Sequence, residues 1–331
     1  MSTFAAVVLF VGVVAYAVLG GADYGAGFWD LTAGGARRGK EPRRLIDETL
    51  APVWEANHVW LIFCLVMLWT GFPGAFAAIM TTLYIPLGLA ALGIVVRGSG
   101  FAFRKVVVRT DQQRATGAAF AASSVITPFF LGTVAGGIAS GRVPAAGYGD
   151  PISSWVNPTS LLGGALAVLT TAFVAAVFLT AEARTRGLPD LATWYRRRAQ
   201  VISAVTGALA LAGIAILRAD APRLFDGLLS RGLPLVLVSA ACGVASLLLL
   251  PRAHPRLLQA LAVTAAGAIV AGWGVAQYPY MLGTHLTIGE AAAPDPTLWS
   301  LSIVATIALL VVVPSLGLLY VLQQRGRLTS H

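Results

Sequence analysis

The sequence predicts an all-α integral membrane protein with nine transmembrane helices. Of its 331 residues, 57% are hydrophobic and only 11% are charged, and the mean hydropathy is +0.78. A soluble domain would carry about a quarter charged residues. The apolar runs are long, unbroken and rich in leucine, valine and alanine. Such runs indicate membrane-spanning helices rather than the short alternating strands of a barrel.

The nine helices correspond to apolar runs of about 20 residues, the length that a bilayer requires. We expect them at residues 3–31, 51–71, 74–97, 115–139, 158–183, 199–217, 233–250, 257–277 and 297–322. Pro128 predicts a kink in the fourth helix. The connecting segments are predicted to be loops: a basic loop at 37–44, an amphipathic loop at 218–232 and a polar loop at 278–296.

The basic residues orient these helices. An odd number of spans puts the termini on opposite sides, and basic residues favour the cytoplasmic side. With the N-terminus outside, 19 of the 23 Lys and Arg residues fall in cytoplasmic segments. The remaining four are Arg142, Arg218, Arg223 and Arg231. We therefore predict an outer N-terminus and a cytoplasmic C-terminus. Membrane topology explains the net charge of +9, so nucleic acid is not an expected partner.

Acidic residues interrupt the first two helices at matching depths. Asp23 and Asp30 are seven positions apart on one face of the first helix, and Glu55 lies near the start of the second. In the predicted orientation all three lie near the inner face, which suits proton uptake from the cytoplasm. A carboxylate at the edge of the hydrocarbon is costly and is read as functional by default. Arg97, at the inner end of the third helix, either pairs with one of these acids or anchors its helix at the cytoplasmic face.

The segment around Glu55 combines several polar and aromatic side chains. On a helix Glu55 and His58 share a face, and Trp54, Asn57 and Trp60 form a neighbouring stripe. This pattern fits a functional site. It equally fits a helix cap whose tryptophans lie at the lipid headgroups.

Glycines are concentrated next to Asp23. Gly21 and Gly25 form a small-xxx-small pair, which lets another helix backbone approach closely. A phosphate-binding loop is excluded, because no strand precedes this segment and no Lys-Ser or Lys-Thr follows it.

Together these motifs resemble subunit II of the cytochrome bd-type quinol oxidases. The resemblance rests on GADYGAG at 21–27, APVWEANHVWL at 51–61, Phe72-Pro73 with Tyr84, and RGSGFAFR at 97–104. A weaker similarity is Tyr278-Pro279 before the last helix. The resemblance follows the whole chain in span order and is specific in the first 105 residues.

The resemblance implies a heterodimeric terminal oxidase of the bacterial cytoplasmic membrane, which couples quinol oxidation to the reduction of O2 to water. In such enzymes subunit I binds the b- and d-type haems and oxidises quinol. Subunit II binds no haem, packs against subunit I as a pseudo-symmetric partner, and supports proton or O2 access. A small single-helix subunit, membrane lipid and quinone are further candidate partners.

The resemblance also implies two four-helix bundles and one peripheral helix. It divides this chain into a first bundle at 1–140, a second bundle at 141–280, and a segment at 281–331. That last segment holds an outer loop, the last helix and a cytoplasmic tail.

By motif position, we expect a proton pathway through Asp23, Glu55 and Asp30. The motif and interface residues are Trp54, Asn57, His58, Trp60, Arg97 and Arg104. The chain departs from the family pattern at four positions. Gly20 and Ala102 stand where an acid is common, Glu55 replaces an aspartate, and His58 replaces an amide. These changes leave open whether the proton route is shorter here or lies in subunit I.

Haem ligation by this chain alone is not expected. A bis-histidine site needs ligands on facing helices, and His58 is the only one of four histidines near a helix interior. No metal site and no catalytic residue are predicted in this chain. Two other classes remain: a secondary transporter or channel with acids in its first two helices, and a scaffold subunit whose acids are only structural. A transporter would work alone in liposomes, whereas an oxidase subunit would copurify with a haem-bearing partner.

Overall fold

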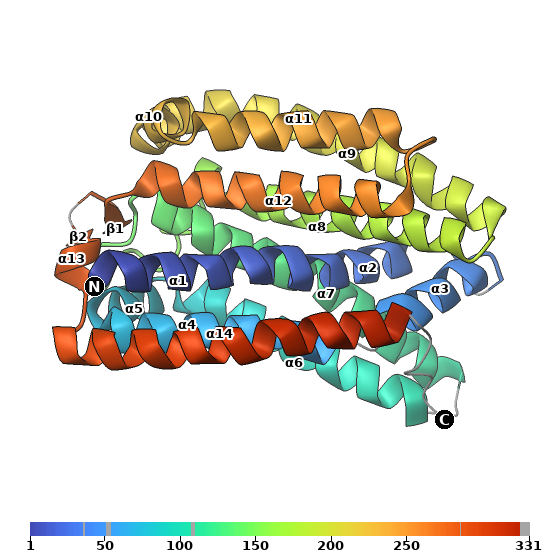
Figure 1. Ribbon diagram of the computed structural model, residues 1–331, viewed down its shortest axis with the longest axis horizontal. Helices are drawn as coiled ribbons and strands as arrows, with labels where there is room; N and C mark the ends of the chain where they lie inside the picture. Colours follow the sequence, from blue (N-terminus) through green and yellow to red (C-terminus); the bar gives the residue numbers. More distant parts are fainter. Residues whose placement is uncertain (36, 51–53, 107–109, 285, 325–331) are drawn as a thin grey trace.

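The computed structural model is a bundle of helices that run along one long axis (Figure 1). It describes residues 1–35, 37–50, 54–106, 110–284 and 286–324. The side chains at 50, 54–55, 101–106, 110–115, 320 and 322–324 lie outside this description. The elements in chain order are α1 (Ser2–Ala15), the π-helical turn η1 (Tyr16–Gly20), α2 (Gly21–Thr32), α3 (Lys40–Leu50), α4 (Trp54–Gly71), α5 (Pro73–Thr82), α6 (Tyr84–Val106), α7 (Thr110–Ala139), α8 (Pro158–Thr185), α9 (Pro189–Asp220), α10 (Pro222–Ser230), α11 (Leu233–Leu249), α12 (Pro255–Gln277), β1 (Tyr280–Leu282), β2 (Leu286–Thr287), α13 (Ile288–Ala291) and α14 (Asp295–Gln324).

The prediction of an all-α membrane protein is confirmed. Among the described residues, six helices are long and apolar enough to cross a membrane, or up to eight if each of two bent pairs counts as one span. The bends are 116° between α4 and α5 and 79° between α10 and α11. A shorter apolar helix covers Tyr84–Gly100. The first helix runs without a break from Ser2 to Thr32, as expected for residues 3–31.

The third predicted helix is divided in two, so a single helix at 74–97 was wrong. α5 ends at Thr82, and α6 begins at Tyr84 and continues to Val106. Pro86 supplies the physical reason, because it has no N–H to donate to the carbonyl of Thr82 four residues earlier, and its ring would clash with that carbonyl.

Two segments predicted to be loops contain amphipathic helices instead. α3 begins at Lys40 inside the expected basic loop, and α10 occupies most of the expected loop at 218–232. On α3, Leu45 and Ile46 are buried, while Arg44 and Glu48 pair at 2.8 Å on its exposed side. A short helix with one apolar face can cover the end of a bundle. Because only one face is apolar, a search for apolar runs of membrane-spanning length does not detect it.

Two further boundaries differ from expectation. α9 begins at Pro189 rather than at 199, because a proline is well tolerated at the first helical position. The basic run 196–198 therefore lies inside a helix. The polar loop at 278–296 holds the antiparallel pair β1–β2 and the short helix α13, whose start is capped by Thr287 and Glu290.

Two buried clusters form the core. One is centred on α8 and includes Trp29 of α2, Phe173 of α8 and Tyr195 of α9. The other joins α1, α4, α5 and α14, and includes Met67, Phe72 and Leu298. The division at residues 140 and 280 stays a prediction.

The glycines of α2 explain how closely α2 and α8 pack. A Cβ at Gly25 would collide with the carbonyl of Thr171 on α8, and a Cβ at Gly21 would lie 3.2 Å from the Thr171 methyl. The expectation that these glycines admit a second backbone is confirmed. This contact fixes the α2 segment that carries the acidic residues.

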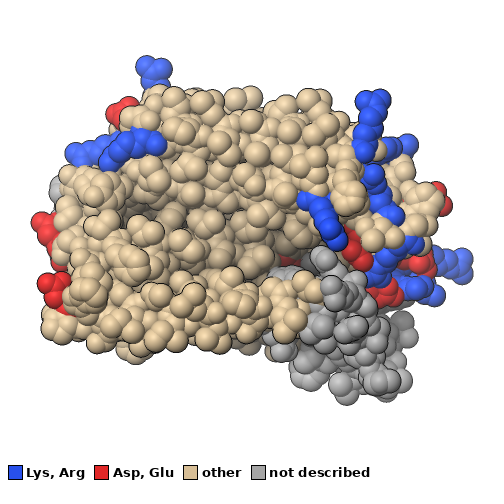
Figure 2. Space-filling model, in the orientation of Figure 1, with Lys and Arg blue, Asp and Glu red and all other residues tan. Residues whose placement is uncertain are grey.

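The two ends of the bundle differ in charge. α1 and α14 begin at the same end and run in the same direction (Figure 1). Most of the visible Lys and Arg side chains gather at the opposite end, around α3 and the connection between α8 and α9 (Figure 2).

Candidate functional site

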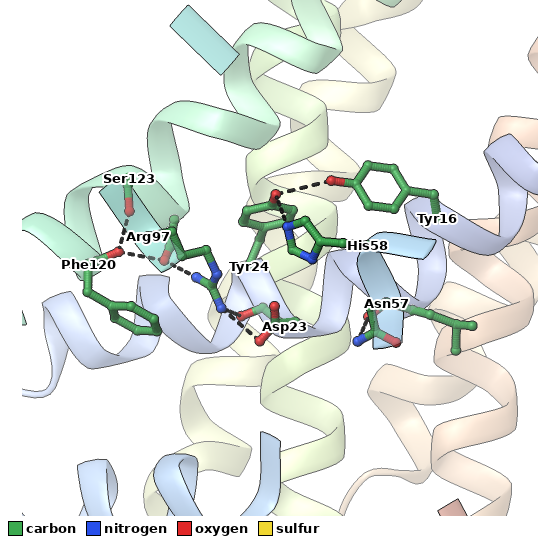
Figure 3. Close-up of polar contacts among 10 residues, drawn as sticks. Tyr16, Asp23, Tyr24, Asn57, His58, Arg97, Phe120 and Ser123 are labelled. Atoms are coloured by element: carbon green, nitrogen blue, oxygen red, sulfur yellow. Dashed lines mark hydrogen bonds and ion pairs between the residues drawn. The ribbon is translucent and has the colours of Figure 1, made fainter. Parts of the chain in front are cut away.

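Asp23 on α2 and Arg97 on α6 form an ion pair inside the bundle (Figure 3). Arg97 Nη2 donates to Asp23 Oδ1 at 2.7 Å and to the Asp23 carbonyl at 3.1 Å. The two side chains are only 3% and 2% exposed, respectively. Charges so far from water persist only when they are paired and hydrogen-bonded. Asp23 and Arg97 belong to two separate sequence motifs, and in the structure they are in direct contact.

Arg97 has further partners besides the carboxylate. Its Nη1 donates to Ser124 Oγ on α7. Its guanidinium lies 4.5 Å from the ring centroid of Phe120 and 4.9 Å from that of Tyr24, which are cation–π distances. Gly27 leaves room for this arrangement, since a Cβ there would collide with Ser124 Oγ and lie 3.1 Å from Arg97 Nη1.

A chain of hydrogen bonds lies beside the Asp23–Arg97 pair. The Tyr24 hydroxyl lies 3.3 Å from His58 Nε2 on α4 and 3.1 Å from the Tyr16 hydroxyl (Figure 3). Tyr24 is buried, while Tyr16 and His58 are partly buried. The His58 ring also packs edge-on against Tyr16, with ring centroids 6.2 Å apart. Three elements, η1, α2 and α4, thus meet through polar groups within an otherwise apolar region.

The π-helical turn η1 shapes the start of this site. Single π-turns inside α-helices are frequent at functional sites. The carbonyl of Leu19 in η1 accepts a hydrogen bond from Asn57 Nδ2 at 3.1 Å. Asn57 is 2% exposed. This buried amide fixes α4 against the first helix one turn before Asp23.

Asp30 belongs to a different ion pair at the end of α2. Arg43 on α3 donates to Asp30 Oδ1 at 2.7 Å and to the Asp30 carbonyl at 3.4 Å. Arg43 also donates to the carbonyl of Gly34. The arginine side chain is 26% exposed, so this pair reaches solvent. Asp23 and Asp30 therefore lie on one helix in two separate surroundings.

Three predicted site residues, Trp54, Glu55 and Arg104, have side chains outside the described residues. Their backbone belongs to α4 or α6. Trp60 is buried and packs edge-on against Phe63, with ring centroids 6.2 Å apart. Its indole N–H has no hydrogen-bond partner among the described residues. Trp60 thus packs at the α4 interface without a direct bond to Asp23.

Sequence reasoning missed several residues of the site: Tyr16, Tyr24, Arg43, Phe120 and Ser124. Tyr24 lay within the glycine motif, next to Asp23, so its sequence position was a usable signal. The polar pair Ser123-Ser124 inside an apolar helix was another signal. Arg43 could not be told from its basic neighbours by sequence alone.

The histidines of the described residues do not fit a haem. His58 Nε2 faces the Tyr24 hydroxyl. His254 caps the start of α12 by accepting a hydrogen bond from the Arg256 N–H. His285 and His331 lie outside the described residues. Two axial ligands on facing helices are therefore not assembled in the part of the chain that the structure describes.

Sequence comparison identifies the family of this chain and several relatives. The family model described as cytochrome bd terminal oxidase subunit II matches residues 1–323. The chain is 29% identical over 211 residues to cytochrome bd ubiquinol oxidase subunit 2 of Bacillus subtilis, covering 63% of this chain and 60% of that protein. It is 30% identical over 216 residues to cytochrome bd-I ubiquinol oxidase subunit 2 of Escherichia coli K12, covering 62% and 55%. The matched part thus spans less than two thirds of either relative.

Structural comparison agrees on the fold. A chain of the bd oxidase from Geobacillus thermodenitrificans superposes with a TM-score of 0.77 at 24% identity. The match covers 96% of this chain and 97% of the other. The family model and the structural match each extend over nearly the whole chain, which belongs to the cytochrome bd terminal oxidase subunit II family.

Proposed function

We propose that this chain is the non-haem subunit of a bacterial quinol oxidase that reduces O2 to water. Asp23 and Glu55 pass protons from the cytoplasmic side toward the active site of a haem-bearing partner subunit. The observation that carries this proposal is the buried Asp23–Arg97 pair within an apolar bundle. Ionisable groups at such depth are costly and mark proton or ion pathways.

The chain crosses the membrane nine times, with its N-terminus outside and its C-terminus in the cytoplasm. The six long helices, the two bent pairs and the apolar helix Tyr84–Gly100 supply segments for nine crossings. The common starting end of α1 and α14 supports an odd number. The concentration of basic side chains at the other end supports the direction.

Asp23 is the proton-carrying group at the centre of the route. Its Oδ2 is buried and has no hydrogen-bond partner among the described residues, so it can accept a proton. When Asp23 becomes neutral, Arg97 keeps the Asp23 carbonyl, Ser124 Oγ and two aromatic rings. Arg97 therefore keeps these neutral contacts when the carboxyl group takes up a proton, although it loses its negative partner.

Asp30 is the entrance to this route. Its partner Arg43 is partly exposed, so the pair borders on solvent. Asp23 and Asp30 are separated by about 10 Å along the helix axis, which is too far for direct transfer. Transfer between them needs a further titratable group or water, and the sequence motif assigns that role to Glu55.

The test is the rate of O2 reduction by the purified complex with Asp23→Asn or Glu55→Gln. Each change should slow the rate by at least about tenfold, because a proton donor in the path is lost. Glu182→Gln is the matched control, since Glu182 lies at the same end but pairs with Arg186 outside the site. Haem content must stay unchanged. Wild-type rates and pH profiles in both variants would refute the proposal.

A further inference from the structure

Tyr16, Tyr24 and His58 are polar groups of the site that the route through Asp23 and Glu55 does not use. Their hydroxyl and imidazole groups are linked in series, at 3.1 Å between the two hydroxyls and 3.3 Å between Tyr24 and His58. The Tyr16 and Tyr24 backbones are about 12 Å apart along the helix axis. Their hydroxyls nevertheless meet, so the two side chains reach toward each other along the helix.

We propose that these three residues form a proton relay from His58 on α4 to the Tyr16 hydroxyl near the middle of the first helix. This inference rests on the proposed function, and it names the residues that continue the route beyond the acids. Imidazole is the side chain whose ordinary titration range suits proton exchange near neutral pH. A tyrosine hydroxyl both donates and accepts, so it can pass a proton on.

The step balances without a redox partner. Protonated His58 releases a proton from Nε2 to the Tyr24 oxygen while Tyr24 gives its own proton to the Tyr16 oxygen. Tyr16 in turn releases its proton to a water molecule. One proton enters at His58, one leaves at Tyr16, and rotation of the two hydroxyls resets the chain. No bond between heavy atoms forms or breaks.

The geometry is suited to a relay. The three polar groups lie within hydrogen-bond reach of one another in series, at distances longer than the usual 2.7–2.8 Å between hydroxyls. Catalytic hydrogen bonds are often long in the resting state and tighten during turnover. Gly20 makes room for the chain, because a Cβ there would lie 2.9 Å from the Tyr16 ring.

The ionisable groups around His58 come from two sides. Tyr16 and Tyr24 face it from the first helix, and Asp23 lies near enough to interact with it electrostatically. Arg97 lies on the Tyr24 ring and also contacts Asp23. The relay thus borders on the Asp23–Arg97 pair through the Tyr24 ring.

The test measures O2 reduction, its pH profile and its solvent deuterium isotope effect in the purified complex. Tyr24→Phe removes the hydroxyl but keeps the ring that supports Arg97. We expect a rate about tenfold lower and a larger isotope effect, with unchanged haem content. Tyr16→Phe should behave in the same way. His58→Asn keeps a hydrogen-bonding group but cannot titrate, so it should flatten the pH profile.

Tyr195→Phe is the matched control, because it removes another buried hydroxyl, bonded to the Pro42 carbonyl outside the relay. It should keep the wild-type rate. Wild-type rate, isotope effect and pH profile in Tyr24→Phe and Tyr16→Phe would overturn the relay. If Asp23→Asn is slow in that case, the proposed function survives without the relay. If Asp23→Asn is also wild-type, both fail. Should Tyr24→Phe fail to assemble, Tyr16→Phe and His58→Asn decide the question.

Discussion

Two aspartates on one helix form ion pairs of the same length in different surroundings. The Asp23–Arg97 and Asp30–Arg43 contacts are both 2.7 Å. Arg97 is 2% exposed, whereas Arg43 is 26% exposed. Loss of Asp23 would leave a positive charge that water cannot reach, while Arg43 can turn toward solvent. Burial of the arginine, rather than the distance, therefore distinguishes the two pairs.

The largest expected effect is on the buried pair. Asp23→Ala should destabilise the protein by about 3–5 kcal/mol, because it leaves Arg97 buried and unpaired. The measurement is thermal unfolding of the purified complex in detergent. The double variant Asp23→Ala/Arg97→Met should recover most of the loss, since it removes both charges. Equal destabilisation of the single and double variants would show that the pair does not hold the site.

A smaller loss of stability is expected when the packing of α2 against α8, which positions Asp23, is disturbed. Gly25→Ala should cost about 1–3 kcal/mol, because the new methyl would collide with the Thr171 carbonyl and push α2 from α8. Gly243→Ala is the control, since nothing lies within 4 Å of a Cβ at that position. Unfolding in detergent compares the two variants. Equal stability would contradict the close contact between these helices.

The Asp30–Arg43 pair should lose less stability than the Asp23–Arg97 pair, because Arg43 is partly exposed. Asp30→Ala should cost about 1 kcal/mol, because Arg43 remains partly solvated and keeps the carbonyl of Gly34. The effect should shrink in high salt, since pairs near the surface are screened. Unfolding at low and high ionic strength checks this expectation. If Asp30→Ala lost as much stability as Asp23→Ala, and if salt did not change that loss, the distinction between the two pairs would be wrong.

The smallest change in stability is expected for Glu48 on the surface of α3, near the Asp30–Arg43 pair. The hydrogen bond from Arg44 lowers the pKa of Glu48 below its ordinary value. The stability that ionised Glu48 contributes to the folded protein is therefore complete above the ordinary pKa of glutamate. This contribution is lost as the pH falls through the lowered pKa. Glu48→Gln should cost less than about 0.5 kcal/mol near neutral pH, because the carboxylate is solvent-screened. Stability profiles of both proteins against pH should converge in acid, and a constant gap would contradict this cause.

The fold was largely predictable because membrane helices are specified by apolar length. The first helix matched its predicted range, and its glycines admitted α8 as expected. The amphipathic helices α3 and α10 were not predicted, since they are too short and too polar for a span. The break at Leu83 was marked by Pro86 and could have been read from it.

The site was predictable in part. Asp23 and Arg97 were recognised as separate motif residues, but their contact depends on how α2 and α6 pack. The resemblance leads one to expect an acid at Gly20, and the Tyr16 ring covers that position instead. The contact between Tyr24 and His58 joins residues 34 positions apart on two different helices. The spacing of residues along a single helix cannot predict such a contact.

The most direct test of the account is whether Asp23 changes its protonation state during turnover. Infrared difference spectra of the purified complex, recorded between its reduced and oxygen-reacted states, detect the stretching band of a protonated carboxyl group. The account predicts such a band in the wild-type complex and its loss in Asp23→Asn, with haem content unchanged. An identical band in Asp23→Asn, together with a wild-type rate of O2 reduction, would contradict it.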